Sequence, residues 1–242
     1  MLGRFHVLYK PLRDALARRL RVPSIPSCLE QLRAKGLHPR HIIDVGAYRG
    51  DFARDCLRVW PEARITCFEP QPHMQAALGA LAGQYPGQMA VYDCLLGAAA
   101  QDAVSLYQAE TASSVLAEHV ATHPSLARPM RTLDGLREAL AFGACDLLKL
   151  DVQGYELEVL KGAQETLGPV QAIVAEINLL DIHKDVPLLP EVVGWLDQRG
   201  FVPYDLCGLT RRPLDGALWQ VDMTFVPRES GLRRDKRWGA DA

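Results

Sequence analysis

From residue 42 onward, short apolar runs alternate with segments whose apolar residues recur at helical spacing. The runs that have the length of buried strands are 42–45, 64–68, 89–96, 146–152 and 172–177, with a short extra strand at 104–107. The helical segments are 52–60, 74–81, 156–167 and 190–199. This alternation predicts an α/β fold in which helices cover both faces of a parallel sheet.

The end of the chain breaks this alternation. The segments 201–206 and 218–226 have the pattern of strands, and no helical segment separates them. In the second segment, Trp219 and Val221 alternate with Gln220 and Asp222, and strict alternation is typical of a half-buried antiparallel strand. A mostly parallel sheet that ends in an antiparallel hairpin is therefore expected.

The two ends of the chain differ from this central region. Residues 1–23 are rich in arginine, and Phe5, Leu8, Leu12, Leu16 and Leu20 form one apolar stripe at helical spacing. Such a basic amphipathic helix suits either peripheral contact with a membrane surface or partner, or packing against the main domain. We therefore divide the chain into a lead-in at 1–38, a main domain at 39–228 and a charged tail at 229–242.

Composition limits the classes of protein to consider. The net charge of -2 gives no overall attraction to nucleic acid, so no nucleic-acid partner is expected. The six cysteines lack metal-ligand spacing, which favours reduced thiols and a cytoplasmic location. No run approaches the ~18 apolar residues of a membrane span, and the N-terminus has no signal-peptide pattern.

Polar and glycine residues at the carboxyl ends of the strands are the expected site residues, because ligands of open α/β sheets bind there. The first strand is followed by Asp44-x-Gly46-x-x-x-Gly50, with Ala47 and Tyr48 inside the turn. Glycine at the turn permits a close backbone approach. A third glycine, which pyrophosphate-binding GxGxxG loops contain, is absent.

The next two strand ends extend this nucleoside site. Glu69, followed by Pro70, can accept hydrogen bonds from both hydroxyls of a ribose, although it could instead cap the next helix. At the third strand end, Asp93 could bind an adenine amino group beside Cys94, or could belong to a turn before Gly97.

The fourth and fifth strand ends are expected to form a second, polar half of the site. Alternation places Lys149 and Asp151 on one side of a strand, and a charge inside an apolar strand is costly unless it is paired. The fifth strand ends in Glu176, which lies near Asp151 if the two strands are neighbours. The other residues assigned to this half are Gln153, Tyr155, Asn178 and His183.

Four motifs of the chain resemble the FkbM family of methyltransferases. They are IDVGA at 43–47, FEP at 68–70, LKLDVQGYELEVLKGA at 148–163 and DMTFV at 222–226, and Glu176 also agrees. The resemblance covers roughly residues 40–227. It implies a Rossmann-like class I methyltransferase fold with a seven-stranded sheet, S-adenosylmethionine as methyl donor, and an oxygen acceptor on a sugar, a glycan or a small natural product.

The expected chemistry is transfer of a methyl group to a hydroxyl, which needs a base or a metal to remove the proton. Asp151 is the first candidate for the base, and Glu176 and His183 are the next. A divalent cation held by Asp151 and Glu176 is an alternative. The other functions considered are a non-catalytic nucleoside-binding protein and an NAD-dependent oxidoreductase. The sequence does not indicate the oligomeric state.

Overall fold

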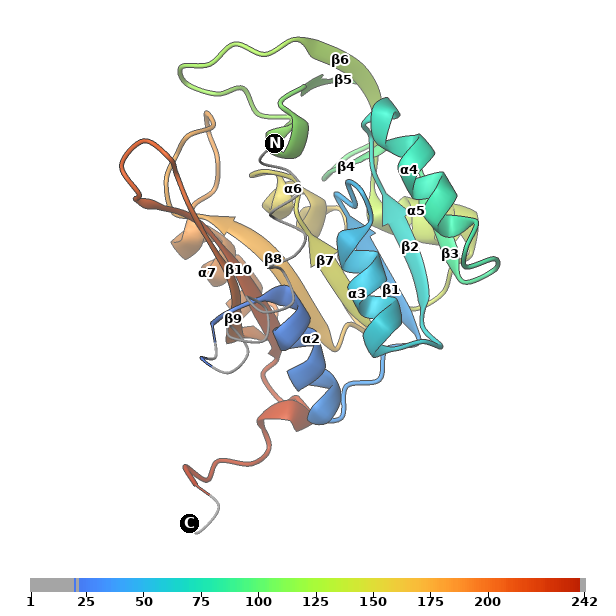
Figure 1. Cartoon of the computed structure of the whole chain (residues 1–242), viewed down its shortest axis with the longest axis vertical. Coiled ribbons are helices and arrows are strands. Elements are labelled where there is room, and N and C mark those ends of the chain that lie inside the picture. Colours follow the sequence, from blue (N-terminus) through green and yellow to red (C-terminus); the bar gives the residue numbers. More distant parts are fainter. Residues whose placement is uncertain (1–19, 21, 240–242) are drawn as a thin grey trace, which may run out of the picture.

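The computed structural model describes residue 20 and residues 22–239. Over these residues, seven strands form a central sheet in the order β3-β2-β1-β7-β8-β10-β9 (Figure 1). The first five strands in this order are parallel, and β10 is antiparallel to both β8 and β9. The predicted fold, a mostly parallel sheet with a C-terminal antiparallel hairpin, is confirmed. The strands are β1 (His41–Val45), β2 (Arg64–Phe68), β3 (Met89–Tyr92), β7 (Leu147–Leu150), β8 (Ala172–Asn178), β9 (Phe201–Arg211) and β10 (Leu218–Pro227).

Helices cover both faces of this sheet. One face carries α2 (Ile25–Ala34), α3 (Asp51–Val59) and α4 (Pro72–Ala82). The other carries α5 (Leu133–Leu140), α6 (Glu156–Lys161) and α7 (Leu189–Asp197). Successive residues of a strand point to opposite faces, so Ile42 packs with the first layer and Ile43 with the second. In the part of the chain described, no helix is long and apolar enough to cross a membrane.

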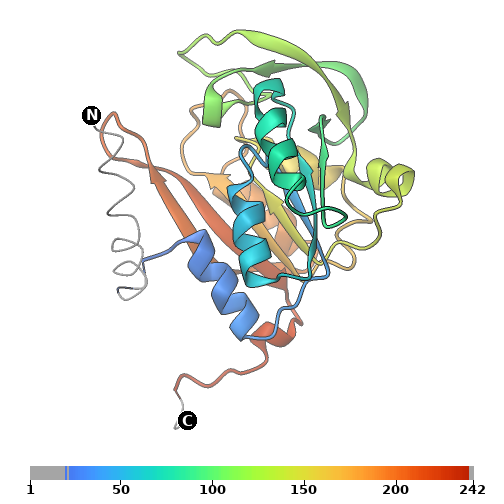
Figure 2. The same cartoon turned by 45° about the vertical axis from the view of Figure 1, so that its right-hand side comes forward.

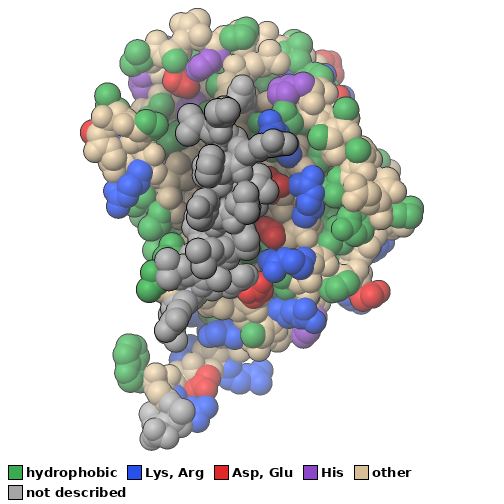
Figure 3. Space-filling view, in the orientation of Figure 1, with side chains coloured by type: hydrophobic (Ala, Val, Ile, Leu, Met, Phe, Trp, Pro, Cys, Tyr) green, Lys and Arg blue, Asp and Glu red, His purple; other side chains and the backbone are tan. Residues whose placement is uncertain are grey.

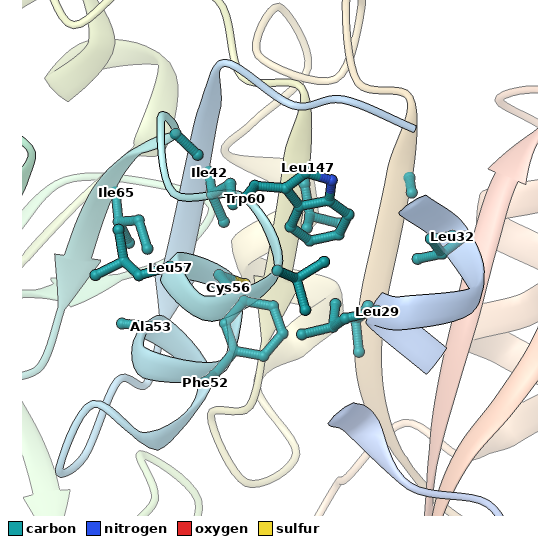
Figure 4. Close-up of a cluster of buried hydrophobic side chains, with 14 of the residues drawn as sticks. Leu29, Leu32, Ile42, Phe52, Ala53, Cys56, Leu57, Trp60, Ile65 and Leu147 are labelled. Carbon is teal, nitrogen blue, oxygen red and sulfur yellow. The ribbon is translucent and has the colours of Figure 1, made fainter. Parts of the chain in front are cut away.

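The helix α2 was not predicted, because its apolar residues lie just after two prolines. Ser24 caps it by accepting a hydrogen bond from the Ser27 amide, and a proline in the first turn is compatible with a helix. Its Leu29 and Leu32 pack with Phe52 of α3 in a buried cluster (Figure 4). The packed domain therefore begins before residue 39. The helix predicted for residues 1–23 lies outside the described residues, apart from its last few positions.

Several predicted boundaries were wrong. The run 89–96 is two strands, because β3 ends at Tyr92 and β4 (Leu95–Leu96) belongs to a second sheet of order β4-β6-β5. The predicted helix 156–167 ends at Lys161. The strand expected at 104–107 is longer, as β5 (Gln101–Tyr107). Neither β6 (Ser125–Arg131) nor α5 was predicted, since the β6 sequence contains a proline and no alternation of apolar and polar residues.

The second sheet forms a cover over the carboxyl ends of the central strands (Figures 1 and 2). Its small core consists of Leu95, Leu106 and Met130, which pack with Tyr155 from the loop before α6. The cover is thus attached to the central sheet through the loop that carries the most specific sequence motif.

Backbone hydrogen bonds tie three strand ends together below this cover. The amides of Gly46 and Ala47 both donate to the Phe68 carbonyl, and the Asp151 amide donates to the Val45 carbonyl. Gly46 has φ +79°, and a Cβ added there would lie 1.8 Å from the Asp151 carbonyl oxygen. This glycine is therefore required by contact between two strand ends.

Replacement of Gly46 by alanine should destabilise the whole domain. The left-handed backbone and the overlap with the Asp151 carbonyl together should lower the free energy of unfolding by about 3 kcal/mol or more. Gly194→Ala is the matched control, because a Cβ there meets nothing within 4 Å inside α7. That change should raise stability by about 0.5–1 kcal/mol. Chemical denaturation of both variants checks this, and equal stabilities would contradict it.

Candidate active site

A cavity of about 320 Å³ lies at the carboxyl ends of the central strands. The first half of its wall comes from the ends of β1 and β2 and from the loops after β1, β2 and β3. The second half comes from the loop after β7, from Glu176 of β8 and from the β9–β10 hairpin. Residues 111–113 and Val115 of the cover form part of the wall. Of the residues predicted from sequence, the cavity is lined by Gly46, Tyr48, Glu69, Pro70, Cys94, Asp151, Gln153, Tyr155 and Glu176.

Glu69 is the central group of the first half. Its side chain is buried at the end of β2, with the residue 2% exposed. It accepts hydrogen bonds from the backbone amides of Tyr48 (2.8 Å) and Gln71 (2.9 Å). Tyr48 has φ +46°, a strained conformation for a residue with a side chain, and this conformation accompanies the donation of its amide to Glu69. Burial raises the pKa of Glu69, and the two amides oppose that rise.

Lys149 joins the two halves of the site from below. Its Nζ lies 3.0 Å from Asp151 Oδ2, 3.6 Å from Asp44 Oδ1 and 3.3 Å from the Gly46 carbonyl oxygen. Burial by itself would lower the pKa of Lys149, but Asp151 and Asp44 more than offset this, so its pKa is raised and the ammonium stays charged. Asp44 is 0% exposed, and burial raises its pKa while Lys149 opposes the rise. Lys149 and Asp44 support the site without lining this cavity.

The second half contains a network of carboxyl and amide groups. Gln153 Nε2 donates to Asp151 Oδ1 (2.8 Å) and to Glu176 Oε2 (2.7 Å). Gln220 Nε2 donates to the same Glu176 oxygen (2.7 Å) and lies 3.2 Å from Gln153 Oε1. Gln153 has φ +54°, so a strained backbone holds its amide between the two carboxyl groups.

Buried acids surround Asp151 in this half. The pKa of Glu176 lies well above its ordinary value, chiefly because of burial and then because of the neighbouring Asp151. Burial likewise raises the pKa of Glu156 to about 7 and that of Asp222 to about 6. Asp151 is different, because its side chain is 31% exposed and it pairs with Lys149. Burial therefore favours the protonated form of Glu176, whereas Asp151 is partly exposed and paired with an ammonium.

The structure does not bring every predicted residue to the cavity. Asp93 is exposed and forms an ion pair with Arg128 of β6. Gly50 lies between α3 and α4, where a Cβ would be 2.5 Å from Leu81. Ala47 is buried and lines a smaller neighbouring cavity together with Lys149.

Asn178 and His183 are buried behind the second half of the site. Both side-chain polar atoms of Asn178, and Nδ1 of His183, have no hydrogen-bond partner among the described residues. The His183 ring lies 6.5 Å from that of Trp219, which does line the cavity. Burial lowers the pKa of His183, so its imidazole is neutral near pH 7.

The metal alternative has little structural support. Among residues 22–239, no group of three or more His, Cys, Asp or Glu side chains is arranged to hold a metal ion. The amide of Gln153 lies between Asp151 and Glu176, where a bridging cation would have to bind.

Sequence reasoning missed several wall residues. Gln71 directly follows the FEP motif. Gln220 lies two residues before Asp222 and on the same face of β10, so the sequence pattern could have indicated both residues. Ser113 of the wall and its neighbour Ser114 carry no such signal, although they fix the cover. Ser113 Oγ donates to Gln71 Oε1 (3.1 Å), and Ser114 Oγ donates to the Gln153 carbonyl (2.8 Å).

The strand order and the ligand cavity above the carboxyl ends of the strands define a class I, Rossmann-like methyltransferase fold. The family model "Methyltransferase FkbM domain" matches residues 44–203, and the chain belongs to this family of methyltransferases.

Solved methyltransferase structures are also similar to this chain. A precorrin-6y C5,15-methyltransferase from Geobacter metallireducens is 10% identical, with a TM-score of 0.48 over 82% of this chain and 86% of that one. An O-methyltransferase family protein from Burkholderia thailandensis is 12% identical, with a TM-score of 0.46 over 89% of this chain and 57% of that one. A search of curated proteins gave no significant match.

Replacement of Lys149 by methionine should leave Asp44 as a buried carboxylate without a counter-ion. We expect the free energy of unfolding to fall by about 3–5 kcal/mol, as when one partner of a buried ion pair is removed. Adding Asp44→Asn to Lys149→Met should restore part of that loss, because the buried charge is then gone. Urea denaturation of the single and double variants measures the coupling, and strictly additive effects would exclude it.

The dependence of stability on pH should show the contribution of Glu156. Since its pKa is about 7 in the folded protein and 4.5 for a glutamate side chain in water, the folded state binds this proton more tightly. The stabilisation of the folded state by this bound proton is complete below about pH 4.5 and is lost as the pH rises to about 7. Glu156→Gln keeps an oxygen for the amides of Val152 and Gly154 but removes the charge.

The difference in unfolding free energy between the wild type and Glu156→Gln should therefore change by about 3 kcal/mol between pH 4 and pH 8, in favour of the variant at high pH. Denaturant titrations across this range provide the measurement. Glu138→Gln, an exposed change on α5, is the control and should give a flat difference.

Proposed function

We propose that this protein transfers a methyl group from S-adenosylmethionine to a hydroxyl of a sugar, a glycan or a small natural product. The observation that carries the proposal is that two carboxyl groups of contrasting environment, Glu69 and Asp151, line one cavity on opposite sides of β1. One is suited to bind a nucleoside, and the other to accept a proton.

The first half of the cavity fits the nucleoside part of the cofactor. Glu69 is buried and already fixed by two amides, so it can accept hydrogen bonds from ribose hydroxyls without reorganising. Phe68, Pro70 and Leu95 provide an apolar wall for a base, with Cys94 beside them. The predicted adenine contact from Asp93 remains a prediction, because this side chain pairs with Arg128. When bound, the cofactor supplies a methyl group on a sulfonium.

The second half fits the removal of a proton from the acceptor. Lys149 Nζ lies 3.0 Å from Asp151 Oδ2, and Gln153 fixes the orientation of this carboxylate. Asp151 is therefore the base that receives the hydroxyl proton. A protonated Glu176 would provide a hydrogen-bond donor in the same half of the cavity. His183 would contribute only indirectly, by positioning the Trp219 ring that it contacts.

The wall of the second half favours an uncharged acceptor. It presents the rings of Trp219 and Tyr155 beside the amide of Gln220 and the hydroxyl of Thr210. None of the described wall residues is Lys, Arg or His, so nothing in that set would bind a phosphate or a carboxylate. Aromatic faces beside hydrogen-bonding groups suit a hydroxylated ring.

We also propose a cytoplasmic location, which is supported by six unpaired cysteines, five of them buried. On the face in Figure 3, Lys and Arg side chains lie among Asp and Glu side chains. Arg58 of α3, for example, pairs with Glu30 of α2 and with Asp55. This mixed surface supports the expectation of a small-molecule or glycan acceptor and not a nucleic acid. Peripheral membrane contact through residues 1–23 remains a proposal about a segment outside the described residues.

Calorimetric titration with S-adenosylhomocysteine tests the cofactor assignment. The wild-type protein should bind it and should not bind NAD. Glu69→Gln should weaken binding by about tenfold or more, because a charged acceptor of two hydroxyl hydrogen bonds is lost. Glu62→Gln, an exposed change just before β2, should leave the affinity unchanged. Equal affinities of the two variants would remove Glu69 from the cofactor site.

Turnover with a panel of neutral methyl hexosides tests the base. Asp151→Asn should lower the rate by about 10²- to 10⁴-fold while the affinity for S-adenosylhomocysteine stays within a few-fold of wild type. Hexose 6-phosphates should be poorer acceptors than their neutral counterparts. Cofactor binding without methylation of any hydroxylated acceptor would instead support a non-catalytic binding protein.

A further inference from the structure

Two cysteines meet away from the active-site cavity, between α2 and the C-terminal hairpin. Cys28 Sγ of α2 lies 3.1 Å from the Thr224 hydroxyl, and Cys207 Sγ of β9 lies 2.8 Å from the same oxygen. Both sulfurs therefore lie beside one hydroxyl oxygen, and each thiol shifts the pKa of the other. Both residues are buried, so this contact is part of the packing of α2 on the sheet.

One of the two thiols has a route to solvent. A cavity of about 360 Å³ is lined by Cys28 together with Ser24, Ser27, Asp205 and Leu206. Cys207 does not line it. A molecule as small as a peroxide can therefore approach Cys28 from this cavity.

The pKa values of the thiols also distinguish Cys28 from Cys207. The pKa of Cys28 is lowered, chiefly by the neighbouring Cys207 thiol and also by the Thr224 hydroxyl. Burial and the charges of Asp205 and Asp222 oppose this shift. Burial raises the pKa of Cys56, Cys67, Cys94 and Cys145, and that of Cys207 is raised by its contact with Cys28. Cys28 is therefore the nucleophile of the pair, because it lines the cavity and its pKa is lowered, and the thiolate is the reactive form.

We propose that Cys28 and Cys207 form a redox modification site in which a peroxide oxidises Cys28 and Cys207 then closes an intramolecular disulfide. In the first step the Cys28 thiolate attacks one peroxide oxygen, the O–O bond breaks, and Cys28 sulfenic acid and one water (or alcohol) form. In the second, the Cys207 sulfur attacks the sulfenic sulfur, the S–O bond breaks, and a second water leaves with the Cys207 proton. Two thiols lose two electrons in total, and the peroxide accepts them.

The disulfide would connect α2 covalently to the hairpin that forms part of the active-site wall. β9 and β10 carry Thr210, Trp219 and Gln220, which line the cavity of the second half. Oxidation would thus fix the hairpin to the helix that follows the N-terminal segment. This inference is independent of the identity of the methyl acceptor.

The test is peptide mapping after oxidation of the full chain. Protein at micromolar concentration is treated with equimolar hydrogen peroxide, blocked with N-ethylmaleimide and digested with trypsin. A cross-link between peptides 22–33 and 200–211 is expected, with loss of two of the six thiols and their recovery on addition of dithiothreitol. Cys207→Ser should instead accumulate a sulfenic acid at Cys28 that dimedone labels.

Cys94→Ser is the matched control, because Cys94 also lines a cavity but its pKa is raised to about 11 by burial. This variant should form the cross-link as the wild type does. Oxidation of Cys94 before Cys28, a cross-link between two molecules, or equal dimedone labelling of all cysteines in Cys207→Ser would overturn the proposal. If Cys207→Ser does not fold, the cross-link map of the wild type still decides the outcome.

Discussion

The ammonium of Lys149 is the interaction on which the site depends. It comes from the centre of the sheet, from the strand β7 that pairs with β1 on one side and β8 on the other. From there it reaches Asp44, Asp151 and the carbonyl of Gly46. A charge at this depth is tolerable only because two carboxylates surround it. Lys149 is thus shared by the two halves of the site. It contacts the turn after β1 in the first half and the carboxylate after β7 in the second half.

Above this ion cluster, the cover determines the shape of the cavity. The 3-10 turn at Glu110–Ala112 and the two serines that follow are fixed to both halves, to Gln71 on one side and to the Gln153 carbonyl on the other. Further along, the backbones of Ala117 and His119 bond to Lys184 and Ile182 in the loop after β8. These contacts are few and mostly between loops, so the cover is a low-stability element compared with the strands below it.

The sequence predicted the central sheet well and the cover poorly, and the reason is physical. Buried parallel strands such as Ile42–Val45 leave long apolar runs, and the alternation in Trp219–Phe225 identifies an antiparallel strand, so local pattern was enough for both. The cover has a core of only three buried residues, and β6 contains a proline and two arginines, so no periodicity marks it. Its serines act through single hydrogen bonds that depend on a tertiary arrangement. For the site, strand-end position located Glu69, Asp151 and Glu176, but it could not show that Asp93 turns outward to Arg128.

The three carboxyl groups at the strand ends have different roles because their surroundings differ. Glu69 has only amide donors, which fix its direction. Asp151 is the most exposed of the three and has the ammonium of Lys149, which stabilises its charge. Glu176 has two amides but lies close to other acids in a buried position, which favours its neutral form. Neighbouring acids whose environments separate their protonation states are the arrangement from which acid and base roles arise. Without Lys149, Asp151 would lose the partner that distinguishes it from Glu176, and the distinction between the proposed base and the proposed donor would disappear with it.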